Sequence, residues 1–92
     1  MTVLIGLLFL GIVGSLVQAM FDQIGDAVRV NHALAVRRVH VRIGRLAGVE
    51  PGLFRTAYDV FRIKTFCSDA PLVIEDADDD ELLLERLELE VP

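Results

Sequence analysis

The stretch Val36-Arg-Arg-Val-His-Val-Arg-Ile-Gly44 decides the fold, because its side chains alternate in character. Valine or isoleucine stands at positions 39, 41 and 43, and arginine or histidine stands at positions 38, 40 and 42. Successive side chains of a strand point to opposite faces, so this period of two predicts a strand with one buried face. Such a strand needs a second layer of structure against its apolar side.

A helix is predicted directly after this strand and its loop. Pro51 suits the first turn of a helix, and Glu50 suits the positive end of the helix dipole. Apolar residues then recur at helical spacing, at Leu53, Phe54, Ala57, Tyr58 and Phe61. We expect the apolar face of the first strand to pack against the aromatic members of this set, Phe54, Tyr58 and Phe61.

Two more strands are predicted near the end of the chain. A short one begins at Leu72 after Pro71, and a last one alternates through Leu87 and Leu89. The leucines at positions 82 and 84 have the opposite phase, so one extra residue near Glu85 predicts a β-bulge or a break. Residues 76–80 are expected to form a solvated turn.

The N-terminal part of the chain predicts a long helix that is apolar all round at its start and amphipathic at its end. Residues 1–21 carry no charged side chain, and residues 3–20 are just long enough to span a bilayer. An amphipathic pattern follows and ends near Asn31. The fold class is therefore α/β, a two-layer α+β domain with a long N-terminal helix and a second helix packed on a small three-stranded sheet. Residues 1–14 are predicted as an apolar helical extension, and residues 15–92 as the domain itself.

Composition excludes several classes of function. A net charge of −5 argues against a partner that is a nucleic acid, and a single cysteine excludes a disulfide within the chain. The hydrophobic fraction of 53% exceeds what one small core can hide. A helix that is apolar all round must be covered by lipid, by a partner or by its own copies. The residues predicted for this association are Leu4, Leu7, Leu8, Gly11, Ile12, Ser15 and Ala19.

Three stretches together resemble one known family. The first strand and its turn, residues 36–51, are followed by an aromatic helix through Tyr58 and then by Ala70-Pro-Leu-Val-Ile-Glu75. This series, with the closing strand over residues 81–91, is similar to the hydrogenase nickel-insertion accessory proteins (HypA/HybF). The resemblance implies a helix-backed small sheet, which agrees with the prediction made from periodicity.

The resemblance also implies two metal sites, and this chain departs from both. Family members open with Met-His-Glu, which holds nickel, whereas Ile12 and Val13 stand at the matching positions here. Members also carry a zinc module with four cysteines between the last two strands. In this chain only residues 75–81 separate Ile74 from Leu82, so we expect a hairpin loop there. The sequence therefore predicts no cofactor for this chain.

Three residues remain as candidates for a replacement nickel site, His32, His40 and Cys67. Their spacing does not require such a site, and the alternative is two surface histidines and one small buried thiol. The sequence shows no recognisable motif for paired catalytic carboxylates, for a catalytic nucleophile or for a phosphate-binding loop. The chain is therefore predicted not to be an enzyme.

The first hypothesis is a non-catalytic HypA-like accessory or scaffold protein. It would bind [NiFe] hydrogenase subunits or maturation proteins, with the basic strand face at Arg38 and Arg42 as a docking surface. It would form homo-oligomers, or attach to a membrane, through its N-terminal helix, and would work in the cytoplasm. The alternative is a nickel metallochaperone for hydrogenase maturation with a non-standard metal site. A third interpretation is a membrane-anchored regulator.

Overall fold

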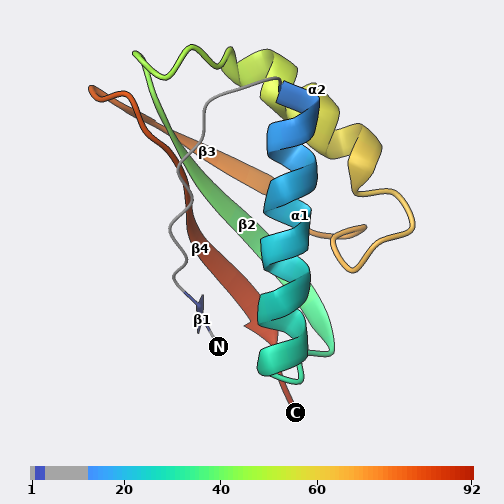
Figure 1. Cartoon of the computed structure of the whole chain (residues 1–92). Coiled ribbons are helices and arrows are strands. Elements are labelled where there is room, and N and C mark those ends of the chain that lie inside the picture. Colours follow the sequence, from blue (N-terminus) through green and yellow to red (C-terminus); the bar gives the residue numbers. More distant parts are fainter. Residues whose placement is uncertain (1, 4–12) are drawn as a thin grey trace.

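The computed structural model describes residues 2–3 and 13–92. These residues form two helices and a mixed sheet, so the predicted two-layer α+β fold is confirmed (Figure 1). Both helices lie on the same face of the sheet. In chain order the elements are β1 (Thr2–Val3), α1 (Val13–Val30), β2 (Ala35–Gly44), α2 (Pro51–Phe61), β3 (Leu72–Ala77) and β4 (Leu82–Glu90).

The sheet is built around β2. Its strand order is β1-β4-β2-β3, with β2 antiparallel to β4 and parallel to β3. The two-residue strand β1 pairs antiparallel with β4 and adds a strand to the three that the sequence predicts. Thr2 and Val3 therefore do not lie in the predicted helix. Both are β-branched residues, which suit an extended backbone.

Helix α1 follows the predicted amphipathic pattern. Leu16, Met20, Ile24 and Ala27 recur at helical spacing and are buried against the sheet. The helix ends where the sequence indicates, because the Asn31 amide Nδ2 donates to the Ala27 carbonyl at 2.7 Å.

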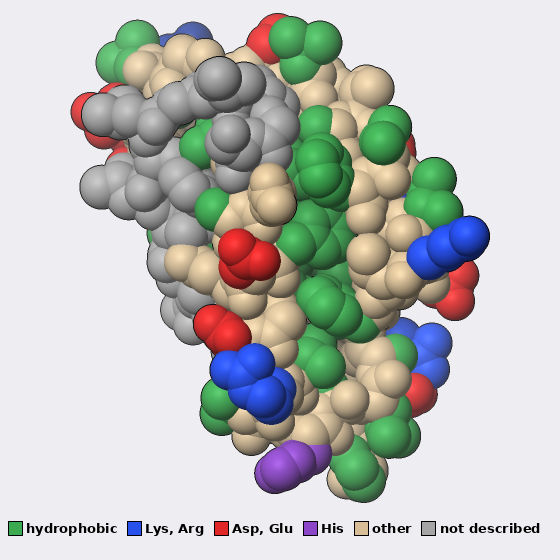
Figure 2. All heavy atoms as spheres, turned by 45° about the vertical axis from the view of Figure 1, so that its right-hand side comes forward, with side chains coloured by type: hydrophobic (Ala, Val, Ile, Leu, Met, Phe, Trp, Pro, Cys, Tyr) green, Lys and Arg blue, Asp and Glu red, His purple; other side chains and the backbone are tan. Residues whose placement is uncertain are grey.

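Helix α2 begins at the predicted signals and buries only part of its aromatic set. The Glu50 carboxylate accepts hydrogen bonds from the backbone N–H groups of Gly52 and Leu53. Phe54 and Tyr58 are buried in the same core as the apolar face of β2. The prediction for Phe61 is wrong: it lies at the last residue of α2, is 42% exposed and contacts the ring of Phe21. Figure 2, in which the right-hand side of Figure 1 comes forward, shows a band of hydrophobic side chains on the surface.

The predicted bulge in β4 is confirmed. His40 pairs with Arg86, whereas the next residue of β2, Val41, pairs with Leu84. Glu85 is therefore the extra residue. The shift lets the two halves of β4, which are out of phase in sequence, turn their leucines toward the same core.

The connection from β3 to β4 corrects the hairpin prediction. The two strands lie on opposite sides of β2, so residues 78–81 cross over the end of β2 instead of forming a hairpin. Three backbone hydrogen bonds fix this crossing: Gly44 N–H to Glu81 O, Arg45 N–H to Ala77 O, and Leu46 N–H to Asp79 O, at 2.8–2.9 Å.

Candidate functional site

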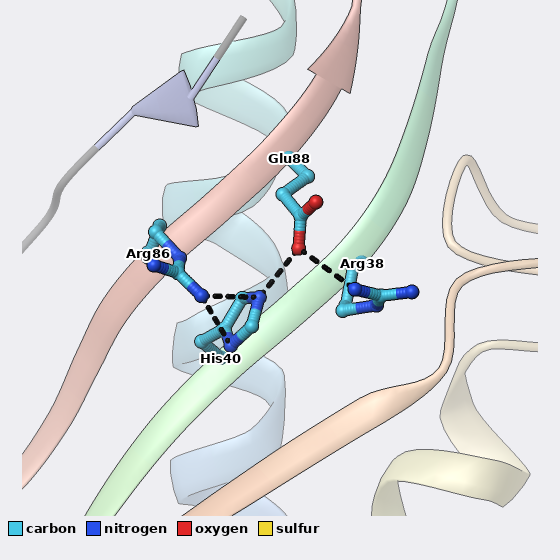
Figure 3. Close-up of polar contacts among 4 residues, drawn as sticks. All are labelled: Arg38, His40, Arg86 and Glu88. Atoms are coloured by element: carbon cyan, nitrogen blue, oxygen red, sulfur yellow. Dashed lines mark hydrogen bonds and ion pairs between the residues drawn. The ribbon is translucent and has the colours of Figure 1, made fainter.

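Four polar residues form a cluster on the face of the sheet that is turned away from α1 (Figure 3). Arg38 and His40 come from β2, and Arg86 and Glu88 come from β4. The alternation of β2 directs Arg38 and His40 to this face, and the antiparallel register places Glu88 opposite Arg38 and Arg86 opposite His40.

His40 is the centre of this outer cluster. Its Nε2 atom lies 2.6 Å from a carboxylate oxygen of Glu88, and the Arg86 guanidinium lies 3.1–3.2 Å from the two ring nitrogens. A ring that donates from Nε2 to Glu88 and accepts at Nδ1 from Arg86 makes one hydrogen bond to each partner. The residue is only 5% exposed, so the prediction of a surface histidine is wrong.

The electrostatics of the outer cluster favour an ionised carboxylate. The hydrogen bond from His40, and then the positive charge of Arg38, lower the pKa of Glu88 below its usual range. Arg38 approaches Glu88 at 3.5 Å and keeps about half of its side chain exposed. The cluster is therefore a tightly paired polar surface in which both arginines, Arg38 and Arg86, are exposed.

A second polar contact closes the crossing at residues 78–81. The guanidinium of Arg42 pairs with the carboxylate of Asp79, which also accepts the backbone N–H of Glu81 at 3.2 Å. The Glu81 hydrogen bond and then Arg42 lower the pKa of Asp79. Of the two residues predicted for docking, Arg42 is thus engaged within the chain. The docking role of Arg38 and Arg42 stays a prediction.

The structure does not bring the three candidate nickel ligands together. His32 lies just after α1 with a φ of 52° and is exposed, whereas His40 lies in the outer cluster. Cys67 is fully buried, and burial raises the pKa of its thiol to about 12. A thiol with that pKa stays protonated near neutral pH, and the thiolate is the form that binds metals. Within residues 2–3 and 13–92, no three or more His, Cys, Asp or Glu side chains gather in a way that could hold a metal ion.

Most of the residues predicted for association lie outside the described part of the chain. These are Leu4, Leu7, Leu8, Gly11 and Ile12. Ser15 and Ala19 lie on α1, where Ala19 is half-buried. None of the helices in the described ranges is long and apolar enough to cross a membrane.

Two features of these sites were not predicted from the sequence. Asp79 and Glu88 act through partners on β2 that lie 37 and 48 residues away. The only local signal for these pairs was the excess of acidic residues over residues 69–92, which have the opposite charge to the arginines of the first strand. Such an excess favours pairing with basic residues of the same domain, but it does not show which residues pair.

Comparison with known proteins identifies the family. The family model described as "Hydrogenase/urease nickel incorporation, metallochaperone, hypA" matches residues 14–80. The hydrogenase maturation factor HypA of Shewanella baltica strain OS185 is 36% identical over 81 residues, which cover 78% of this chain and 69% of that protein. The hydrogenase maturation factor HypA of Aquifex aeolicus is 41% identical over 61 residues, covering 66% of this chain and 53% of that protein.

Solved structures show the same fold. The solution structure of the Ni metallochaperone HypA from Helicobacter pylori superposes with a TM-score of 0.71 at 21% identity, covering 86% of this chain and 97% of that one. A second solution structure of a HypA protein gives a TM-score of 0.60 at 28% identity, covering 74% and 64%. The fold is thus that of the HypA proteins whose structures are solved. This chain belongs to the HypA family.

Membership corrects the prediction of no cofactor. That prediction is wrong because the matched family is one of nickel-incorporating metallochaperones, and HypA from Helicobacter pylori is a Ni metallochaperone. The family consists of accessory proteins in hydrogenase maturation, so the nickel metallochaperone alternative has more support than the scaffold hypothesis. A four-cysteine zinc site does not fit this chain alone, because Cys67 is its one cysteine.

Proposed function

We propose that this chain takes part in nickel incorporation during hydrogenase maturation, as a nickel metallochaperone with a non-standard metal site. The observation that carries the proposal is the family match over residues 14–80, which spans α1, β2, α2, β3 and the crossing. Nickel is the cargo of this process, and the chain acts as a binding and docking protein and not as an enzyme. Its partners are hydrogenase maturation proteins.

Among the described residues, His32 is the best placed imidazole for contact with nickel. Both ring nitrogens of His40 are engaged with Glu88 and Arg86, and Cys67 is a buried thiol. His32 is exposed at the end of α1, where its backbone N–H donates to the Arg29 carbonyl at 3.3 Å, and its ring makes no hydrogen bond with another described residue. Neutral imidazole is a good ligand for nickel. His32 supplies one donor, and further donors must come from elsewhere on the chain or from the protein that exchanges nickel with it.

Equilibrium dialysis of the intact chain against nickel tests this proposal. We expect saturable binding that weakens at least about tenfold in His32→Asn, because one nitrogen ligand is lost. Leu34→Ala is a matched control, since Leu34 is exposed two residues further on. Unchanged affinity in His32→Asn would reject His32 as a ligand, and the absence of saturable binding would reject the metallochaperone role.

The division of the chain at residue 14 and the association of its N-terminal segment remain predictions. The family match begins at residue 14, which supports the proposed boundary. Light scattering of the full chain and of a chain without residues 2–13 tests the association: an oligomer that becomes a monomer supports it, and two monomers reject it.

A further inference from the structure

The outer edge of β3 offers unpaired backbone groups. β3 stands at one end of the strand order and pairs only with β2, so no described strand lies along its other side. The opposite end of the sheet differs, because β4 has β1 beside it at Leu87 and Glu88. An exposed strand edge of this kind is a template for another extended chain.

The hydrogen bonds show which residues of β3 face outward. Val39 N–H donates to Pro71 O, and Arg45 N–H donates to Ala77 O, so the odd-numbered residues of this segment face β2. Backbone groups alternate between the two edges of a strand, and Leu72, Ile74 and Asp76 therefore face outward. The Leu72 carbonyl already accepts from the Arg55 side chain at 2.9 Å. Within the described ranges, Ile74 and Asp76 each keep one outward N–H and one outward C=O without a partner.

The side chains along this open edge are apolar at its centre and acidic toward its end. Val73 and Ile74 are half-buried, whereas Glu75 and Asp76 are exposed and have no ion pair within the described ranges. The next two acids are neutralised, Asp78 by Arg45 and Asp79 by Arg42. Among the described residues, Glu75, Asp76 and Asp80 have no ion pair at this end of the sheet, whereas Glu81 interacts with the charge of Arg42.

We propose that the β3 edge binds an extended segment of a partner protein by strand addition, and that the segment alternates apolar residues with lysine or arginine. The apolar residues would lie beside Ile74 on the helix side of the sheet, and the basic residues would lie beside Glu75 on the other face, because successive side chains of a strand point to opposite faces. A second copy of β3 in a parallel, in-register pair is disfavoured as the occupant, because it would bring the same acids together across the new pair. The acids thus oppose parallel self-pairing and favour a basic partner. This inference goes beyond the proposed function and does not depend on nickel binding.

Hydrogen exchange of the intact chain tests the inference with a defined probe. The probe is the peptide acetyl-Lys-Val-Lys-Val-Arg-Val-Lys-amide, and its matched control has glutamate at each basic position. We expect the basic peptide to slow exchange at the amides of Ile74 and Asp76 at least about tenfold. The amides of Val73 and Glu75 face β2 and should change little. Equal effects of the two peptides, or no protection at Ile74 and Asp76, would overturn the proposal.

A pair of variants separates the backbone contact from the charge. Asp76→Ala removes the carboxylate and keeps the outward N–H, whereas Asp76→Pro removes both and leaves the ladder to β2 intact, because prolines are tolerated on free strand edges. We expect peptide affinity to fall a few-fold in Asp76→Ala and at least about tenfold in Asp76→Pro. Circular dichroism identical to the parent confirms that both variants fold. Equal affinity of Asp76→Pro and Asp76→Ala would show that the outward N–H is not used, and would overturn strand addition.

Discussion

Replacing Gly44 with alanine should destabilise the domain strongly, because the crossing from β3 to β4 passes directly over this residue. A Cβ atom at position 44 would overlap the carbonyl oxygen and the Oδ1 atom of Asp79, and would lie 2.6 Å from the Asp79 carbonyl carbon. The clash is mainly with backbone, so no side-chain rotation relieves it. The crossing must move away from the end of β2.

The size of the effect follows from what that movement disturbs. Three backbone hydrogen bonds join residues 44–46 to the crossing, and Arg42 pairs with Asp79 beside them. Each hydrogen bond contributes about 0.5–1.5 kcal/mol net, and an overpacked site costs about 1–3 kcal/mol. Because partial relaxation keeps some of these contacts, we expect a loss of about 2–4 kcal/mol in the free energy of unfolding. That is a large share of the roughly 5–15 kcal/mol typical of a domain.

Urea denaturation followed by circular dichroism measures this loss. Gly25→Ala is the matched control, because a Cβ there would lie 3.5 Å from the Phe66 ring, an ordinary contact. Alanine also favours a helix over glycine by about 0.8–1.0 kcal/mol, so Gly25→Ala should be neutral or stabilising. A loss below about 0.5 kcal/mol in Gly44→Ala would refute the close crossing.

Four further predictions rest on separate contacts. Ile43→Ala should lower the free energy of unfolding by about 2–5 kcal/mol in a denaturant melt, because Ile43 is 2% exposed in the core. A much smaller loss would show that Ile43 does not lie on the buried face of β2. The His40 hydrogen bond lowers the pKa of Glu88 in the folded chain, so its stabilisation is present at neutral pH and is lost as pH falls below about 4. Glu88→Gln should therefore flatten the acid limb of stability against pH, and an unchanged limb would contradict the contact. Burial should make Cys67 react with a thiol reagent only as fast as the chain unfolds, so rapid labelling of folded protein would count against it. Deleting residues 2–13 should leave the far-ultraviolet spectrum of the domain in place and remove only the pairing of β1 with β4; a coil spectrum would move the domain boundary.

Local patterns in the sequence predict much of this fold, because they report local geometry. The alternation through Val39 and Val41 defines the buried face of β2, Glu50 marks the start of α2, and the phase change in the last strand places the bulge at Glu85. Each of these depends on neighbours in the chain, where periodicity and capping act directly.

The failures concern neighbours in space. A short connection between two strands favours a hairpin, and nothing local shows that β2 lies between β3 and β4. His40 was expected at the surface because its strand position is polar, and only the register with β4 brings Glu88 and Arg86 around it. Phe61 fits the apolar spacing of α2 but is its last residue, where it lies against the Phe21 ring and stays 42% exposed.

Restoration of hydrogenase activity in a bacterium that lacks its own HypA tests the central claim most directly. Cells that make this chain, grown at limiting nickel, should regain nickel-dependent hydrogenase activity, and cells with an empty vector should not. A second measurement at excess nickel shows whether the defect is one of nickel supply, since excess metal should reduce the difference between the two strains. Full activity in the complemented cells is the result that the account predicts. No activity, with the chain present at normal level and folded, would contradict a role in nickel incorporation.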